Sequence, residues 1–372
     1  MLLMELKHYE VNNKFNEDVV YETDSFENRG VIPANTRLQM EIKANDMAKK
    51  PHVQISLSTN NSTIIKSVVI FAEGIFKGET HIVHPQASKL CPDLSVSLFL
   101  PKDTPIDIHV KAMVGYPNTV QFHIFEITRQ LPRFSMYSLI PTPESNMPEG
   151  YVQFKVNERL ERICMWINQN FLLESDIDVQ PGHTLTISFK CLRNGLPLVL
   201  NFEKSGNFKF YTDSMLLASD LIQSMTSYLN IDTLKSVAVF PDEEKCLKLL
   251  IDNLSNMEDA NLRLGADFTQ KLREIGTLVI QAEDSRLCNE TEMISFYHEL
   301  MKLNEDMINE HNIRLRNYTE GVNTMKQINA FLQKTSRLRV GQKSSDILNH
   351  CRNAIKTNNI EELINIIRRG ET

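Results

Sequence analysis

The distribution of proline divides this chain into two parts of different character. All fourteen prolines lie between Pro33 and Pro241, and the final 131 residues contain none. Proline inside a helix removes a backbone hydrogen bond and clashes with the preceding turn, so a long segment without proline can remain helical. The sequence therefore predicts a helical carboxy-terminal part after Pro241, preceded by a part with many turns.

Residues 31–127 show the pattern of β-strands. Apolar and polar residues alternate in four short runs with turn residues between them. The apolar members are Val53, Ile55 and Leu57; Val96, Leu98 and Leu100; Ile106, Ile108, Val110 and Ala112; and Val120, Phe122 and Ile124. A period of two is typical of half-buried antiparallel strands, and several of them within about 100 residues favour a β-sandwich.

The following segment, up to residue 240, mixes helix and strand patterns. We expect Asn157 and Asp213 to cap two amphipathic helices. The first helix carries its apolar stripe at Leu160, Ile163, Cys164, Ile167 and Phe171. Between the helices, alternating runs joined at Asn194-Gly195 and at residues 205–207 predict a three-stranded meander, and SVAVF adds a strand. A sheet with two helices is an α+β domain.

After Pro241, apolar residues recur every three or four positions in two long stripes, which predicts a heptad-patterned helical hairpin. The first stripe contains Leu247, Leu250, Leu254, Met257, Leu264, Phe268, Leu272, Ile275, Val279 and Ala282, with polar Asn261 in its gap. The second contains Met293, Phe296, Leu300, Leu303, Met307, Leu315, Tyr318, Val322, Met325 and Leu332.

Each stripe contains two consecutive four-residue steps, which we interpret as a stutter in the coiled coil. The steps fall at Leu264-Phe268-Leu272 and, with His311 facing the core, at Met307-His311-Leu315. The sequence DSRLCNET is expected to reverse the chain between the two helices. Two short helices, at 345–356 and 360–369, are expected to end the chain.

The segment VIFAEGIFKGETHIVHP, residues 69–85, concentrates groups that bind phosphate or metals elsewhere. Gly74 and Gly78 are one residue too close for a phosphate-binding loop, and Lys77 precedes the second glycine instead of following it. His81 and His84 lie on a β-branched segment, where a spacing of three points side chains to opposite faces. We therefore predict a strand, a turn and a second strand here, with no catalytic, cofactor or metal site in the chain.

Charge and cysteine usage limit the functional classes. The net charge of −7 argues against a general nucleic-acid binder, because phosphate binding requires a positive surface. The six cysteines form no C-x-x-C pair and are interpreted as reduced, mostly core thiols. Without a secretory signal or an apolar run of roughly 20 residues, an intracellular, soluble protein is expected.

Three groups of residues are candidates for partner binding. Leu2, Leu3, Leu6 and Tyr9 form a helical stripe that begins without a cap, like the end of a longer helix. Trp166, the single tryptophan, lies off its helix's apolar stripe; it either packs on the neighbouring sheet or domain or is a partly exposed anchor for a peptide or partner. In the locally basic carboxy-terminal segment, Arg337 and Arg339 either contact acidic partners or anionic lipid, or pack their stems and pair locally.

Several long stretches resemble one known family when taken together. They are RGVIPANTRL, IFAEGIFKGETHIVHP, QFHIFEITRQLPRFSMYSL, MWINQNFLL, QAEDSRL, SRLRVG and RNAIKTNNI. In this order they are similar to the carboxy-terminal half of the Bardet-Biedl syndrome 2 family of BBSome subunits. We expect the chain to correspond to that half, without the family's β-propeller.

The resemblance implies a domain order for the chain. It implies the end of a coiled-coil helix at 1–15, an adaptor-ear-like β-sandwich at 29–130, an α+β platform at 131–240, a helical hairpin at 241–340 and carboxy-terminal helices at 341–372. Platforms of clathrin-adaptor appendages, which are similar, can receive short peptide motifs on an aromatic residue, and Trp166 is the matching residue type here.

The resemblance also implies a function, which we state as an expectation. The chain would be a non-catalytic subunit of the BBSome, a coat-like complex that moves membrane proteins to and from the cilium. Its partners would be sister subunits, especially the Bardet-Biedl syndrome 7 and 9 proteins, with membrane-protein cargo bound through the complex. It would require no cofactor and would be found in the cytoplasm, at the cilium and ciliary membrane, and at the basal body and centriolar satellites. The alternative is a peptide-binding adaptor acting through the platform; a metal or nucleotide enzyme would rest on residues 69–85 alone.

Overall fold

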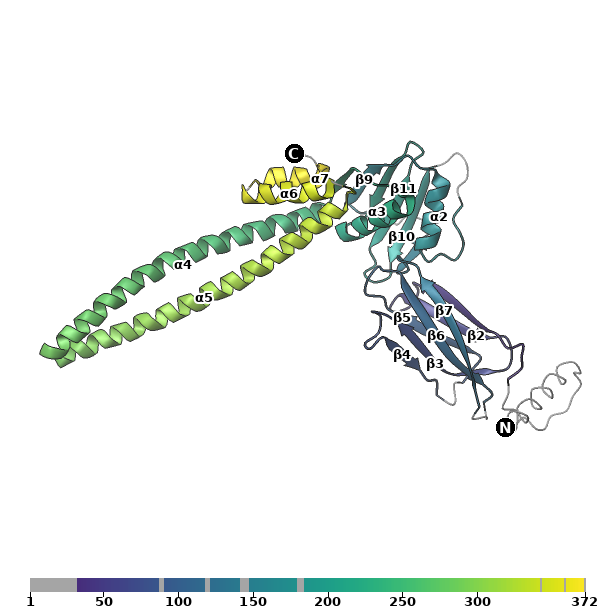
Figure 1. Ribbon diagram of the computed structural model, residues 1–372, viewed down its shortest axis with the longest axis horizontal. Helices are drawn as coiled ribbons and strands as arrows, with labels where there is room; N and C mark the ends of the chain where they lie inside the picture. The colour runs from purple at the N-terminus through teal and green to yellow at the C-terminus, as the bar shows by residue number, and fades with distance from the viewer. Residues whose placement is uncertain are drawn as a thin grey trace, which may run out of the picture. The chain divides into compact units, whose positions relative to one another are not determined.

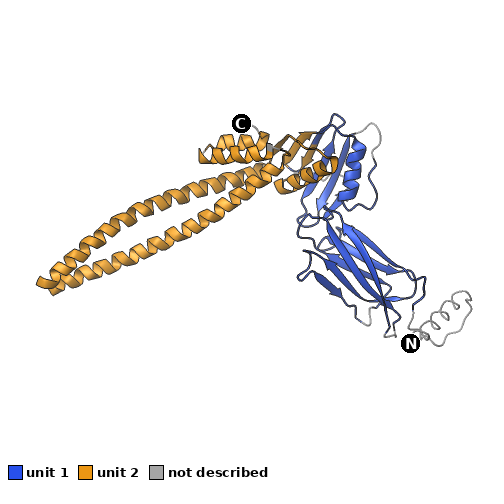
Figure 2. Cartoon of the chain, in the orientation of Figure 1, with its two compact units in different colours: residues 1–148, 156–208 blue, residues 149–155, 209–372 orange. Residues whose placement is uncertain are grey.

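The computed structural model describes residues 32–86, 90–117, 121–140, 147–178, 184–341, 343–357 and 359–370. The chain forms two compact units (Figure 2). The first consists of residues 1–148 and 156–208, and the second of residues 149–155 and 209–372. Figure 1 shows the order of the elements along the chain.

The first unit begins with a β-sandwich of two antiparallel sheets. One sheet has the order β1-β2-β5 and the other β4-β3-β6-β7. Their bounds are β1 (Leu38–Asn45), β2 (His52–Thr59), β3 (Ile64–Ala72), β4 (Thr80–Val83), β5 (Asp93–Leu98), β6 (Ile106–Gly115) and β7 (His123–Leu131). The alternating residues Val53, Ile55 and Leu57 of β2 are fully buried in the core between the sheets. The predicted sandwich is confirmed.

On β7 the predicted direction of the side chains is wrong. Phe122 and Ile124, expected to face the core, are about half exposed, whereas Phe125 packs against the core. Val120 lies outside the described residues. Because side chains alternate along a strand, a shift of one residue exchanges the inward and outward sets. The outward face of β7 also carries aromatic and aliphatic residues. The inward and outward sets therefore could not be distinguished from the sequence.

Residues 69–85 form the predicted hairpin. They span the end of β3, a turn and β4, with Val69 opposite Ile82 in the antiparallel register. Gly74 and Gly78 have φ angles of 73° and 85°, a conformation that glycine adopts without a steric cost. His81 is exposed and stacks on Phe76, with the ring centroids 4.8 Å apart.

A six-stranded sheet follows the sandwich, in the order β13-β9-β12-β11-β10-β8. Its strands are β8 (Tyr137–Ile140), β9 (Tyr151–Lys155), β10 (Leu185–Cys191), β11 (Pro197–Phe202), β12 (Asn207–Tyr211) and β13 (Ser236–Val239). Two helices accompany it, α2 (Leu160–Asn170) and α3 (Met215–Leu229). The predicted α+β fold with its meander β10-β11-β12 is confirmed.

Both predicted helix caps are wrong. Helix α2 begins at Leu160 after Arg159, three residues beyond Asn157, and has no side-chain cap. Helix α3 is capped by Ser214, whose hydroxyl accepts from the Leu217 amide (3.3 Å). Asp213 instead accepts from the Gly150 amide (3.0 Å), which ties the helix entry to the strand β9 region. Serine and aspartate are both good caps, so the sequence alone could not choose between neighbours.

The second unit contains the long helices α4 (Pro241–Cys288) and α5 (Glu290–Arg337), followed by α6 (Lys343–Lys356) and α7 (Ile360–Arg369). The two long helices form an antiparallel hairpin (Figure 1). Asn289, within the predicted reversal segment, ends α4 and caps α5, because its side chain accepts from the Thr291 amide (3.2 Å). None of the described helices is long and apolar enough to span a membrane.

Candidate functional site

The predicted partner-binding residues have different positions in the structure. Leu2, Leu3, Leu6 and Tyr9 lie outside the described residues. Trp166, Arg337 and Arg339 are described, and they differ strongly in exposure.

Trp166 is fully buried, so the expectation of a partly exposed anchor is wrong and the packing interpretation agrees with the structure. Its ring meets Phe171 edge-on, with centroids 6.1 Å apart, and Phe171 stacks on Phe189 of β10 at 4.3 Å. The buried side of α2 contains Ile163 and Ile167 together with Trp166, so this side is wider than the stripe we had expected. The large ring completes an aromatic core instead of presenting a surface to a partner.

Arg337 and Arg339 differ in their tertiary contacts. Arg337 pairs with Asp220 of α3 (Nη2 to Oδ1, 2.6 Å), and its side chain is 45% exposed. Arg339 is buried, and its Nη2 donates to the carbonyl oxygens of Ile367 (2.7 Å) and Arg368 (3.0 Å) near the end of α7. Burial lowers the pKa of Arg339 to about 10, so it remains charged at neutral pH. Arg339 is therefore a structural residue, which agrees with the local-pairing interpretation.

Helices α4 and α5 contact each other along a seam, which is the line of inward-facing residues on each helix. The seam follows an uninterrupted heptad repeat. On α4, the buried and half-buried seam positions are Leu247, Leu250, Leu254, Met257, Asn261, Leu264, Phe268, Lys271, Ile275, Leu278 and Ala282. On α5, they are Met293, Phe296, Leu300, Leu303, Met307, Glu310, Arg314, Asn317, Gly321, Thr324, Ile328, Phe331 and Thr335. Steps of three and four alternate throughout both lists, which is the regular coiled-coil repeat.

The predicted stutters are therefore wrong. Leu272 and Leu315, the last residues of the two expected irregular steps, are 50% and 57% exposed, and His311 is exposed as well. The true seam passes through Lys271 and Glu310, which pair with each other across the hairpin. The seam residues are polar in this part of the hairpin. A prediction based on apolar residues alone therefore left the seam and followed a neighbouring stripe.

The middle of the seam is polar over several layers. The Asn317 amide donates to Asn261 Oδ1 (3.3 Å), and the Arg314 guanidinium lies 5.9 Å from the centroid of the Phe268 ring. The hydrogen bond with Glu310, together with its charge, raises the pKa of Lys271 despite partial desolvation. Such pairs fix the register of two helices but contribute less burial of apolar surface than leucine layers would.

A second, exposed stripe on α5 repeats with the same heptad spacing, one residue after the seam. It contains Ile294, Tyr297, Met301, Ile308, Leu315, Tyr318 and Met325, whose exposed fractions range from 41% to 67%. Half-buried Val322 belongs to the same repeat. An apolar stripe at this spacing is the pattern that a helix presents to another helix.

Helix α4 contributes apolar residues to the same side of the hairpin. Leu272 and Val279 also follow seam positions by one residue, and both are exposed. The Tyr297 hydroxyl donates to Glu283 Oε1 (2.7 Å), which shows that these following positions of the two helices lie side by side. We call the seven stripe residues of α5, together with Leu272 and Val279, the apolar face of the hairpin.

The opposite side of the hairpin is mostly polar, with exposed Leu249 and Ile313 as its large apolar residues. A shallow cavity on it is lined by Glu274, Thr277, Gln281, Glu299, Lys302 and Asp306, above the seam residues Leu278 and Leu303. One side of the same helix pair is therefore suited to water and the other to an apolar partner. Large exposed apolar patches commonly mark interaction sites in proteins.

Other chemistry-bearing groups of the sequence are dispersed. Among the described residues, no three His, Cys, Asp or Glu side chains are grouped to hold a metal ion. Cys164, Cys191 and Cys351 are buried, and burial raises the pKa of the Cys164 and Cys351 thiols to about 11. Cys91, Cys246 and Cys288 are exposed, so half of the cysteines lie outside the expected core.

Comparison with known protein families gives three consecutive matches along the chain. They are the BBS2 GAE domain over residues 46–134, the BBS2 platform domain over residues 137–229 and the BBS2 hairpin over residues 241–337. The first match covers the sandwich without β1, the second covers α2, α3 and the six-stranded sheet without β13, and the third covers the α4–α5 pair.

Curated relatives match the chain from end to end. The chain is 41% identical over 374 residues to BBSome complex member BBS2 of Danio rerio, covering 100% of this chain and 51% of the relative. It is 40% identical over 373 residues to the Homo sapiens protein of that name, covering 99% and 51%. It is also 26% identical over 388 residues to BBSome complex member bbs-2 of Caenorhabditis elegans, covering 99% and 52%. The chain thus spans about half the length of these relatives, and with its GAE, platform and hairpin domains it belongs to the BBS2 family of BBSome subunits.

Proposed function

We propose that the chain acts as a non-catalytic assembly subunit of the BBSome and supports the movement of membrane proteins to and from the cilium. The observation that carries this proposal is the apolar face of the hairpin, an exposed stripe of heptad spacing on a family member whose relatives are BBSome subunits. A helix from a sister subunit that packs on this face would bury side chains that water now contacts. The Bardet-Biedl syndrome 7 and 9 proteins are the proposed partners.

The proposed location follows from this role. A subunit of such a complex would act in the cytoplasm, at the basal body and centriolar satellites, and at the ciliary membrane. The alternative role is a peptide-binding adaptor that uses Trp166. The structure argues against this role, because the Trp166 ring is fully buried and cannot receive a peptide. Partner contacts through Leu2, Leu3, Leu6 and Tyr9 remain part of the proposal as a coiled-coil contribution.

The proposal is tested by charging the apolar face. Leu315→Glu combined with Tyr318→Glu places two carboxylates where a partner helix would pack. Because burying an unpaired charge is strongly unfavourable, we expect recovery of the Bardet-Biedl syndrome 7 or 9 protein in co-expression pull-downs to fall about tenfold or more. The pull-down should use the full chain, so that residues 1–15 and the hairpin are both present.

The matched control changes the polar side of the same hairpin. Glu299→Ala combined with Lys302→Ala alters two exposed residues opposite the apolar face and should leave recovery of the partner unchanged. Circular dichroism should show equal helix content in both double variants. Equal partner recovery from the two would rule out the apolar face, and no recovery by the unmodified chain would refute the pairing itself.

A further inference from the structure

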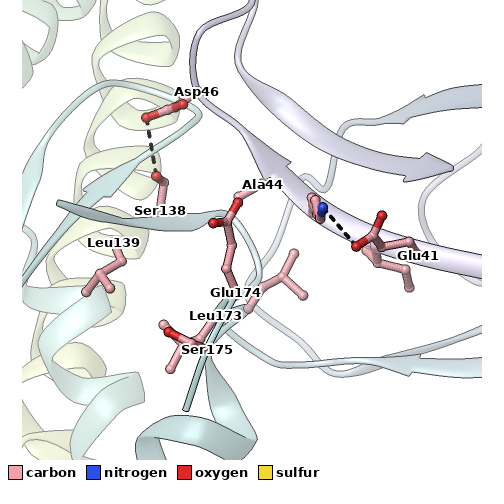
Figure 3. Close-up of a pocket in the computed structure, with 11 residues that line it drawn as sticks. Glu41, Ala44, Asp46, Ser138, Leu139, Leu173, Glu174 and Ser175 are labelled. Atoms are coloured by element: carbon pink, nitrogen blue, oxygen red, sulfur yellow. Dashed lines mark hydrogen bonds and ion pairs between the residues drawn. The ribbon is translucent and has the colours of Figure 1, made fainter. Parts of the chain in front are cut away.

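A cavity within the first unit lies where the sandwich meets the outermost strand of the six-stranded sheet. Its volume is about 380 Å³, and it is bordered by residues 41–44 of β1, by Asp46, by Ser138 and Leu139 of β8, and by residues 172–175 after α2 (Figure 3). Cavities of this size hold small ligands or a few residues of a peptide. We call this cavity the junction groove.

Several contacts join the sandwich to β8 and to the segments that follow β10 and α2. Arg193, which follows β10, pairs with Asp103 of the sandwich and also donates to the Pro101 carbonyl oxygen (3.2 Å). The Tyr137 hydroxyl of β8 donates to Asp103 Oδ2 (3.2 Å). Leu172, which lines the groove, packs against the sandwich core. These contacts therefore hold together the parts of the first unit that border the groove.

Both strands beside the groove are end strands of their sheets. β1 pairs with β2 alone in the three-stranded sheet, and β8 pairs with β10 alone in the six-stranded sheet, among the strands that the structure describes. The two strands contact each other at the groove without forming a ladder. The outer side of an end strand presents backbone N–H and C=O groups that can pair with an extended segment of another chain.

The lining of the groove combines aliphatic surface with an excess of carboxylates. Ile42, Leu139, Leu172 and Leu173 supply the aliphatic part. Glu41, Asp46 and Glu174 are acidic, whereas Lys43 is the one basic lining residue, and Glu41 pairs with it at 2.8 Å. Asp46 Oδ2 also accepts from the Ser138 hydroxyl (3.5 Å), which places this carboxylate beside β8 (Figure 3).

We propose that the junction groove binds an extended peptide segment of a partner protein, with a lysine or arginine between aliphatic residues. The excess negative charge of Asp46 and Glu174 selects the cation, and the aliphatic lining receives its neighbours. Pairing with an open strand edge supplies binding that does not depend on sequence, while the side chains supply specificity. This site is separate from the apolar face of the hairpin and independent of the assembly role.

The test uses the full chain and a random nine-residue peptide library displayed on phage. Panning is performed against the unmodified chain, with counter-selection against Glu174→Lys. We expect enriched peptides to carry lysine or arginine flanked by aliphatic residues. In fluorescence anisotropy with the best labelled peptide, Asp46→Lys and Glu174→Lys should each weaken binding about tenfold. Replacing central residues of that peptide by proline should abolish binding, because proline cannot donate to a strand ladder.

Glu73→Lys is the matched control, since it reverses the same charge at an exposed position in the turn between β3 and β4. It should bind the peptide like the unmodified chain, and the emission of buried Trp166 should be the same in all variants if they are folded. Enriched peptides without basic residues, or equal affinity of Glu174→Lys and Glu73→Lys, would overturn the proposal. So would binding that appears only after deletion of residues 1–31, because the occupant would then come from this chain.

Discussion

At the scale of single residues, the buried charge of Arg339 connects several elements of the second unit. Its guanidinium donates to the carbonyls of Ile367 and Arg368, and to Ser236 O of β13 (3.2 Å). The last carbonyls of a helix lack partners within the helix and attract cations. Gly370 allows this approach, because a Cβ atom there would lie 2.9 Å from Arg339 Nε. One side chain thus joins α7 to the sheet.

Replacing this residue should destabilise the second unit. Arg339→Ala removes the side-chain donor from four carbonyls, so we expect the free energy of unfolding to fall by about 3 kcal/mol, measured by urea denaturation with circular dichroism. Arg339→Lys should recover only part of this loss, because an ammonium group cannot reproduce the planar fork. Arg337→Ala is the matched control and should cost about 0.5 kcal/mol, since the Arg337 side chain is 45% exposed in its ion pair with Asp220. Equal losses for Arg339→Ala and Arg337→Ala would contradict this role.

At the scale of elements, the hairpin combines a polar seam with an apolar outer face. Leucines and methionines occupy much of the seam, yet Asn261, Lys271, Glu310, Arg314 and Asn317 hold its central layers. Glu310 Oε2 is buried without a hydrogen-bond partner among the described residues. The seam therefore fixes the register at the expense of stability, and the exposed stripe offers a further surface for burial.

The asparagine layer provides a test of this interpretation. Replacing both Asn261 and Asn317 by leucine should raise the Tm, and the free energy of unfolding should increase by roughly 1 kcal/mol, because an apolar layer replaces a polar one. Asn317→Leu alone should raise stability less than the double replacement, since it leaves the Asn261 amide without its partner. Thermal unfolding followed by circular dichroism measures all three chains. A lower Tm for the double variant would show that the polar layer stabilises the hairpin.

At the scale of the whole molecule, the chain divides into two compact units that carry different surfaces. The first unit contains the sandwich and the junction groove, and the second contains the hairpin with its apolar face. The chain contains a single tryptophan, Trp166, which is buried in the first unit, so its fluorescence reports on the packing around α2.

This probe allows a test of the junction between sandwich and sheet. A double-mutant cycle with Asp103→Ala and Arg193→Ala, followed by Trp166 fluorescence in urea, should give a coupling energy of about 1 kcal/mol. The pair is mostly shielded from water, with side-chain exposures of 13% for Asp103 and 27% for Arg193, so it should exceed a fully exposed pair. The exposed pair Lys111 and Glu126 on the sandwich is the matched control. A coupling no larger than that of the control would show that packing alone holds the junction.

The sequence by itself determined the order and type of the elements. Periods of two and of seven residues, the glycines at the turns and the absence of proline after Pro241 identified the sandwich, the α+β sheet and the hairpin, because these signals are local. The turn between β3 and β4 and the reversal at Asn289 were predictable for the same reason.

Only the tertiary structure decided which of two neighbouring positions faces inward. Apolar residues occupy both the seam and the stripe beside it, so the pattern could not separate Leu315 from Arg314 until the partner helix was in place. It also placed Trp166 in the core, distinguished Arg339 from Arg337, and brought β1 and β8 together at the junction groove. These outcomes depend on contacts between residues far apart in the chain, and local periodicity contains no information about such contacts.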